Sequence, residues 1–208
     1  IAALAYGTET VPSVKKVVGP GSPYVAAAKR LLSHMIDPGM PAGPSDALIL
    51  ADEGADAWNT ALDVMNEAEH GADSASLLVT HDETLAEKVR EHLPEIIGAL
   101  PGPRREYCAK VFQTYGGIVL TESLEESVNF ANAYAPEHLH LKVARPDDIL
   151  PDLRNTGEIL VGELTPPVLG NFGIGVNAVL PTGGNAATYS CSSIWDFLKR
   201  TSIARCDP

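Results

Sequence analysis

A glutamate and a histidine stand next to each other at positions 137 and 138, and together their side chains could transfer protons. A positioned carboxyl group and imidazole can act as a general acid and a general base near neutral pH. Two polar residues of a surface loop would give the same local sequence, and taken alone the local sequence favours that interpretation. The surroundings of Glu137 and His138 therefore have to decide between the two.

The pair lies where a predicted helix is followed by a predicted strand. Pro136 disfavours helical backbone at Ala135 and marks the end of the preceding helical run. From residue 139 to 144, apolar and polar residues alternate with the period of a strand. Catalytic side chains are commonly held at such junctions on a rigid frame.

A second polar group lies on a helix predicted for residues 55–69. Asp63, Glu67 and His70 are spaced i, i+4 and i+7, so they share one helical face. Glu67 and His70 have the Glu-x-x-His spacing of helical metal sites, in which an oxygen and a nitrogen one turn apart bind one ion. The competing interpretation is a solvated acidic helix end, and the spacing alone favours it.

Two loops carry weaker signals. Gly19, Pro20, Gly21 and Ser22 lie between a predicted strand and a predicted helix, where a helix N-terminus can bind an anion such as pyrophosphate. The G-x-G-x-x-G fingerprint is absent, so the segment taken alone favours a plain tight turn. Ser45 precedes a buried strand and is either a capping residue or a ligand.

The elements that must position these residues alternate between strand and helix. Such alternation predicts an α/β fold of Rossmann-like βαβ units with a mostly parallel sheet. Residues 165–188 are rich in glycine and proline and show no regular period. We expect strands over 15–18, 47–51, 76–80, 117–121, from 139 and over 158–161, and helices over 24–35, 55–69, 83–93, 124–133, from 147, and from 192 or 193 to 200.

Composition excludes several classes of protein. The 208 residues are 45% hydrophobic and 20% charged, as in ordinary globular proteins. A formal net charge of −12 argues against nucleic acid as a partner, and no apolar run is long enough to span a bilayer. Three cysteines at unrelated spacings indicate neither a disulfide framework nor a cysteine-based zinc site, and suggest a reducing compartment. The chain begins within an apolar segment and ends without a tail, so we expect a piece of a longer protein.

Eight motifs follow one another along the chain: ALAYGTET (3–10), VVGPG (17–21), AAAKR (26–30), AGPS (42–45), AEH (68–70), YAPEHL (134–139), VLPT (179–182) and DFLKR (196–200). In this order and spacing they resemble the histidinol dehydrogenase family over essentially the whole chain. The resemblance implies a cytoplasmic, dimeric enzyme that uses NAD twice, and Zn²⁺, to oxidise a primary alcohol through its aldehyde to the carboxylate.

The resemblance also implies roles for particular residues. His138 would accept the alcohol proton in the first oxidation, and Glu137 would activate water to attack the aldehyde in the second. A partner subunit would supply the remaining zinc ligand, a histidine, from an exchanged C-terminal tail, so we expect a homodimer and an inactive isolated chain. The other implied positions are Glu67, His70 and Asn171 for zinc, Gly19, Pro20, Gly21 and Ser22 for NAD, and Ser45 for the substrate.

Four positions depart from the family pattern that the resemblance implies. Glu67 replaces a glutamine that binds zinc and adds a carboxylate, whereas Asn171 replaces an aspartate that binds zinc and removes one. The number of carboxylates at the zinc site therefore stays the same. Pro167 and Ala178 replace a glutamate and a histidine that contact the substrate, and a site without those partners should not select strongly for histidinol. We therefore expect a small alcohol other than histidinol, such as a sulfonated diol. The alternatives are histidinol dehydrogenase itself and a non-catalytic homologue without zinc.

The predicted domain division follows the same resemblance. Residues 1–41 would be the C-terminal part of an NAD-binding Rossmann-like domain. Residues 42–190 would form a second Rossmann-like domain with the catalytic and zinc residues. Residues 191–208 would begin a truncated helical segment.

Overall fold

The computed structural model describes residues 1–207, without the side chain of Asn171. Strands and helices alternate along the chain, as predicted. The strands are β1 (Asp46–Ala51), β2 (Ala75–Thr80), β3 (Gly116–Leu120), β4 (His138–Lys142) and β5 (Glu158–Val161). The α-helices are α1 (Ala2–Tyr6), α2 (Pro23–Leu31), α3 (Ala57–Ala68), α4 (Glu83–Gly98), α5 (Gly102–Thr114), α6 (Leu124–Tyr134), α7 (Pro146–Ile149) and α8 (Pro167–Phe172), and the 3-10 helices are η1 (Leu150–Asp152), η2 (Asn185–Ala187) and η3 (Ile194–Phe197).

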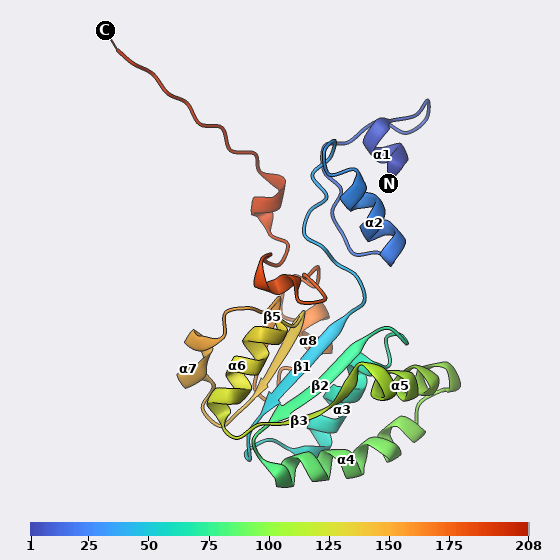
Figure 1. Ribbon diagram of the computed structural model, residues 1–208, viewed down its shortest axis with the longest axis vertical. Helices are drawn as coiled ribbons and strands as arrows, with labels where there is room; N and C mark the ends of the chain where they lie inside the picture. The colour runs from blue at the N-terminus through green and yellow to red at the C-terminus, as the bar shows by residue number, and fades with distance from the viewer. Residues whose placement is uncertain (208) are drawn as a thin grey trace.

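The five strands form one sheet in the order β3-β2-β1-β4-β5, and every pairing between them is parallel. This is the strand order of a Rossmann-like fold, in which right-handed helical crossovers connect parallel strands. The predicted α/β class with Rossmann-like βαβ units is confirmed (Figure 1). The division at residues 41 and 42 stays a prediction.

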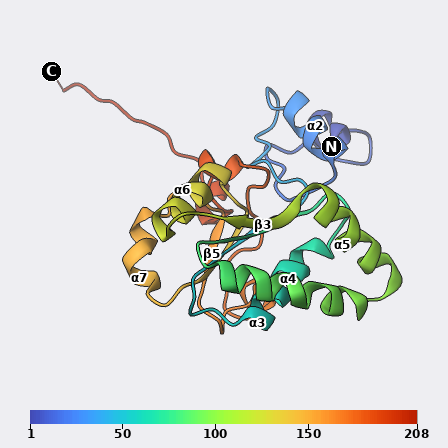
Figure 2. The ribbon, with the colours of Figure 1, turned by 60° about the horizontal axis from the view of Figure 1, so that its bottom comes forward.

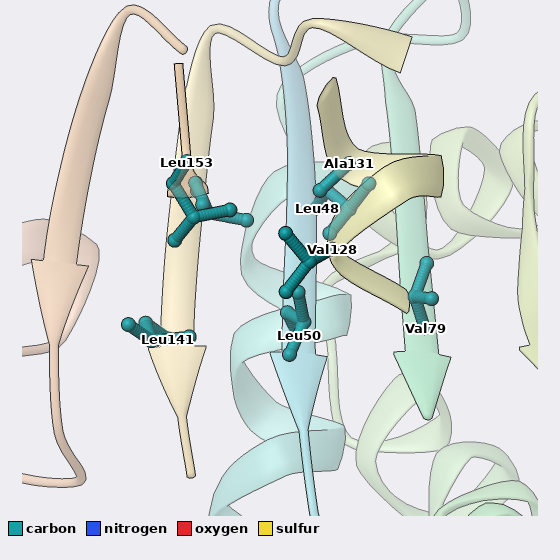
Figure 3. Packing of buried hydrophobic residues seen from close by; sticks show 8 residues of the cluster. Leu48, Leu50, Val79, Val128, Ala131, Leu141 and Leu153 are labelled. Atoms are coloured by element: carbon teal, nitrogen blue, oxygen red, sulfur yellow. The ribbon is translucent and has the colours of Figure 1, made fainter. Parts of the chain in front are cut away.

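Helices cover both faces of the sheet, so the central strands are buried on both sides. Alternate residues of β1 point to opposite faces: Leu48 and Leu50 pack against α6, whereas Ile49 packs against α3 and α4. Figure 2 shows α3 and α4 on the other side of the sheet from α6. The first of these cores, drawn in Figure 3, consists of Leu48, Leu50, Val79, Val128, Ala131, Leu139, Leu141 and Leu153.

The segment that contains α1 and α2 lies beside this body rather than in the sheet (Figure 1). The strand predicted for residues 15–18 is wrong, because that segment makes only an isolated bridge between Lys16 and Asp37. Their side chains also form an ion pair of 2.8 Å. The helix predicted to reach Met35 ends at Leu31. Both residues are exposed, so burial of their side chains does not stabilise a longer helix.

The helix prediction needs correction elsewhere too. α5 was missed because its many charged residues leave no clear apolar stripe and its start, at Pro101 to Pro103, resembles a loop. Proline is in fact tolerated in the first turn of a helix. The final helix predicted up to Arg200 is only the 3-10 turn η3, whose Trp195 is largely exposed, so burial contributes little to extending it. In addition, α8 and η2 lie in the stretch 165–188 that lacked a periodic pattern.

α4 continues five residues beyond its predicted end, through Pro94, to Gly98. Among the described residues, no helix combines the length and the apolar character needed to cross a bilayer.

Candidate active site

Glu137 and His138 lie at the junction of α6 and β4, as predicted, but they are not in a surface loop. Each residue is only 7% exposed. α6 ends at Tyr134, and its C-cap Ala135 has a φ of 54°, which makes it the one described non-glycine residue with positive φ. An L-residue costs about 1–2 kcal/mol in this conformation, and such strain is often found at functional sites. The tight turn places the pair at the amino-terminal end of β4.

Asp46, the first residue of β1, ties this junction to two other segments. Its Oδ1 accepts a hydrogen bond from the backbone N–H of Glu137 (2.8 Å), and its Oδ2 accepts one from Gly183 (2.7 Å). The carboxyl group is buried, which raises its pKa against the lowering effect of these hydrogen bonds. Sequence reasoning missed Asp46, although an acidic residue that opens a buried apolar run was a signal.

The Glu137 carboxylate is held on one side by the residues that precede and begin β1. Its Oε2 accepts hydrogen bonds from Ser45 Oγ (2.7 Å) and from the backbone N–H of Asp46 (3.2 Å). Its Oε1 faces His138 Nε2 at 3.6 Å. The structure therefore brings Ser45, predicted to line a substrate site, into contact with the predicted catalytic carboxylate.

Burial raises the pKa of Glu137 from 4.5 to about 7, and the nearby charge of Glu67 adds to the rise. His138 and the hydrogen bonds from Ser45 and Asp46 lower the pKa but do not outweigh burial. A carboxyl group that titrates near neutral pH exchanges protons readily under physiological conditions, which suits a general acid or base.

His138 is held by Glu158, a residue that the sequence did not single out. Parallel pairing of β4 and β5 sets the two residues opposite each other, and His138 Nδ1 lies 2.6 Å from Glu158 Oε1. Burial lowers the pKa of His138, but the Glu158 hydrogen bond and the charges of Glu137, Glu67 and Glu158 outweigh it and leave the pKa raised. A charged residue at the start of a short predicted strand was the only signal in the sequence.

The raised pKa of Glu137 predicts that stability falls as pH rises. Between about pH 4.5 and 7 the unfolded state loses the Glu137 proton, whereas the folded state keeps it. The contribution of Glu137 to the free energy of unfolding is therefore greatest below about pH 4.5 and is lost as the pH rises through about 7. At 1.36 kcal/mol per pKa unit this amounts to about 3 kcal/mol. Urea denaturation of wild type and Glu137→Gln over this range should show the wild-type decline and a flatter curve for the variant. Parallel curves would contradict the prediction, and Glu53→Gln at an exposed carboxylate should behave as wild type.

Gly157 allows β4 and β5 to approach each other beside the pair. A Cβ atom at this position would lie 2.5 Å from the backbone oxygen of Glu137, and Gly157 N–H already donates to the carbonyl of Pro136 (2.9 Å). We expect Gly157→Ala to destabilise the protein by about 1–3 kcal/mol, as overpacking does. Urea denaturation measures the loss. Gly117→Ala, where a Cβ meets no atom within 4 Å, is the matched control, and equal effects of the two variants would refute the steric explanation.

Glu67 and His70 lie at the end of α3, and their surroundings are compatible with a metal ligand pair. Glu67 is buried, and within the described residues its Oε1 has no hydrogen-bond partner. His70 Nδ1 donates to the carbonyl of Asn66 (2.8 Å), which leaves Nε2 with its lone pair available. The third predicted ligand, Asn171, lies in α8, but its side chain is outside the described structure. Within the described part of the chain, no three His, Cys, Asp or Glu side chains converge on one point.

Asp63 shares the α3 face with Glu67, as its spacing predicted, but it has other partners. Its Oδ2 lies 2.5 Å from Lys142 Nζ and 3.2 Å from His140 Nδ1. Lys142 Nζ also forms an ion pair with Glu163 Oε2 at 3.1 Å. The competing interpretation of a solvated acidic helix end fails for the buried Glu67 and holds for the exposed His70.

The predicted cofactor segment, Gly19 to Ser22, lies between the isolated bridge and α2. Gly19 has a φ of 113°, and its carbonyl accepts a hydrogen bond from the buried Lys29 Nζ (3.0 Å). Ser22 is the N-cap of α2 but makes no capping hydrogen bond through its side chain. A cavity of about 710 Å³ is lined by Gly19 and Lys29 together with Asn185 and Tyr189 near the C-terminal end. No hydrogen bond or ion pair joins this segment to Glu137 or His138 within the described residues.

A parallel sheet in Rossmann-like order, with a buried and hydrogen-bonded carboxyl–imidazole pair at one end, defines an α/β protein with groups that can exchange protons. The chain belongs to the histidinol dehydrogenase family of oxidoreductases, since the family model described as histidinol dehydrogenase matches residues 1–208.

Curated relatives and one crystal structure agree with this assignment. A histidinol dehydrogenase of Synechocystis sp. is 53% identical over 98% of this chain and 47% of its own length. A histidinol dehydrogenase homolog of Rhizobium meliloti is 50% identical over 98% of this chain and 45% of its own length. The crystal structure of histidinol dehydrogenase from Elizabethkingia anophelis superposes with a TM-score of 0.90 at 35% identity, covering 95% of this chain and 45% of that one. The chain thus spans about half the length of these relatives.

Proposed function

We propose that the protein containing this chain is an NAD- and zinc-dependent histidinol dehydrogenase, and that Glu137 and His138 are its proton-transfer residues. The observation that carries the proposal is the buried pair itself, with Ser45 on one side and Glu158 on the other. The 53% identity to a histidinol dehydrogenase supports histidinol as the substrate more strongly than the sulfonated diol expected from Pro167 and Ala178.

The two residues divide the proton transfers of a two-step oxidation. In the first step His138 Nε2 accepts the proton of the substrate hydroxyl group while a hydride leaves the carbon that bears this hydroxyl. In the second step Glu137 accepts a proton from the water that adds to the aldehyde carbon, and the hydrated aldehyde, now an anion, loses a hydride to become the carboxylic acid. When bound, NAD⁺ supplies the hydride acceptor for both steps and Zn²⁺ supplies Lewis-acid polarisation of the substrate oxygen.

The residues of this chain fit both groups. Glu67 offers a buried oxygen without a described partner and His70 an available Nε2, which are donors that Zn²⁺ accepts. Gly19 to Ser22 and the neighbouring cavity, with the Lys29 ammonium group beside it, suit a phosphate-bearing cofactor. We further propose a cytoplasmic homodimer in which a partner tail completes the zinc site.

The substrate is tested by NADH formation in the full-length protein. Histidinol should give two NADH per molecule oxidised, with a kcat within about tenfold of 10 s⁻¹. A sulfonated diol such as dihydroxypropanesulfonate is the second candidate, since Pro167 and Ala178 stand where polar substrate contacts are expected. Activity on the diol with none on histidinol would replace the proposal by that alternative.

The zinc content of the protein tests the remaining alternative, a non-catalytic homologue without zinc. We expect about one zinc per subunit in full-length protein purified without chelator, and loss of NADH formation after chelation. Less than about a tenth of an equivalent of zinc, together with inactivity, would favour the non-catalytic homologue.

A further inference from the structure

Among the described residues, Glu158 is the one carboxylate in hydrogen-bond contact with the His138 ring. Its Oε1 lies 2.6 Å from Nδ1, and both side chains are less than 10% exposed. On the opposite side of the ring, Nε2 faces Glu137 Oε1 at 3.6 Å, slightly beyond hydrogen-bond range. The two ring nitrogens therefore have different environments: Nδ1 is hydrogen-bonded to Glu158, and Nε2 has no hydrogen bond from Glu137.

We infer that Glu158 is a positioning residue for His138: its carboxylate holds the imidazole as the Nδ1–H tautomer and so leaves Nε2 free to accept the substrate's hydroxyl proton. The inference rests on the proposed function, because it concerns the same proton transfer. A carboxylate can only accept a hydrogen bond, so the ring nitrogen next to it must carry the proton. A neutral imidazole has one such proton, which makes Nε2 the base.

The backbone makes this contact difficult to lose. β4 and β5 pair in parallel with His138 opposite Glu158, and the Glu158 N–H donates to the carbonyl of Glu137 (3.0 Å). Within the described residues, Glu158 Oε2 is buried without a partner, so the imidazole is the main group that compensates this carboxylate. When Nε2 takes up the substrate proton, the imidazolium and Glu158 become an ion pair in a largely dry site, which favours the transfer.

The test combines a spectroscopic readout with kinetics on the full-length protein. ¹⁵N NMR of histidine-labelled protein, at a pH where His138 is neutral, reports its tautomer, and His138→Asn assigns the signal. We expect the Nδ1–H form in wild type and a shift toward Nε2–H in Glu158→Gln, whose amide can donate to Nδ1. The same variant should lower kcat about 100-fold or more, with KM within about threefold, as loss of a tautomer-fixing carboxylate does.

Glu53→Gln is the matched control, because Glu53 also lies beside a histidine, His81, at 3.7 Å, but is 70% exposed and far from the pair in the sequence. It should leave kcat and the His138 signal unchanged. An Nε2–H tautomer in wild type, which needs no variant to fold, would overturn the inference. So would a Glu158→Gln protein with wild-type kcat and tautomer. A tautomer shift in a protein inactive on every alcohol would instead keep the positioning role and refute the proposed function.

Discussion

Replacing His138 with asparagine should reduce kcat of the full-length enzyme about 1,000-fold, within the range lost when a general base is removed. The asparagine side chain is smaller and neutral and cannot take a proton at the position of Nε2. It also leaves Glu158 buried without its imidazole partner. KM should change little, because the lost interaction belongs to the transition state for proton transfer. Steady-state NADH formation from histidinol measures both constants.

His92→Asn is the control for this prediction, since His92 packs edge-on against Trp58 on α3, with ring centroids 5.2 Å apart, and faces neither Glu137 nor His138. It should retain kcat within about twofold, as substitutions away from a site do. A His138→Asn enzyme that keeps more than a tenth of the wild-type kcat would show that another group accepts the alcohol proton.

Replacing Glu137 with glutamine should stop the reaction after the first oxidation. Glutamine keeps the size of the side chain, and its amide oxygen can still accept from Ser45 Oγ, so the local structure should persist. An amide cannot accept a proton from water, and the hydration of the aldehyde should slow by about 100-fold or more. The number of NADH formed per histidinol should therefore fall from two toward one. Product analysis with an aldehyde trap measures this directly.

The aldehyde offered as a substrate separates the two steps. Glu137→Gln should fail to oxidise it, while its first oxidation of histidinol stays within about tenfold of wild type. The prediction would be contradicted if both steps slowed equally, since Glu137 would then serve a role common to both. Ser45→Ala is an informative companion: it removes one hydrogen bond from Glu137 but keeps the carboxylate, so two NADH per histidinol should still form.

Much of the fold was predictable from local sequence. β1 and β2 are short apolar runs bounded by polar residues, and their burial on both faces follows from that composition. Asp82 caps α4 because its carboxylate accepts a hydrogen bond from the Leu85 N–H, as its position before the helix suggested. Pro136 marked the junction that holds Glu137 and His138. Alternation of strand and helix then predicted the parallel sheet, because parallel strands require long crossover connections.

Local sequence failed where an element depends on what it packs against. α5 has no clear apolar stripe, yet it buries Cys108 and Val111. The segment near Trp195 has suitable residues for a helix, but its large side chains stay exposed within the described structure. Asp63 shares a helical face with Glu67 and His70, but its carboxylate pairs with Lys142, a distant residue of β4. In each case tertiary contacts outweigh a weak local preference.

By itself the sequence determined that Glu137 and His138 stand together at a helix-to-strand junction, and that ordered motifs around them match one family. Only the tertiary structure decided that the pair is buried, that Ser45 and Asp46 hold Glu137 from 91 or more residues away, and that Glu158 holds His138. The reason is strand register: the period of a strand shows which face a residue occupies, but not which residue of the neighbouring strand lies opposite it.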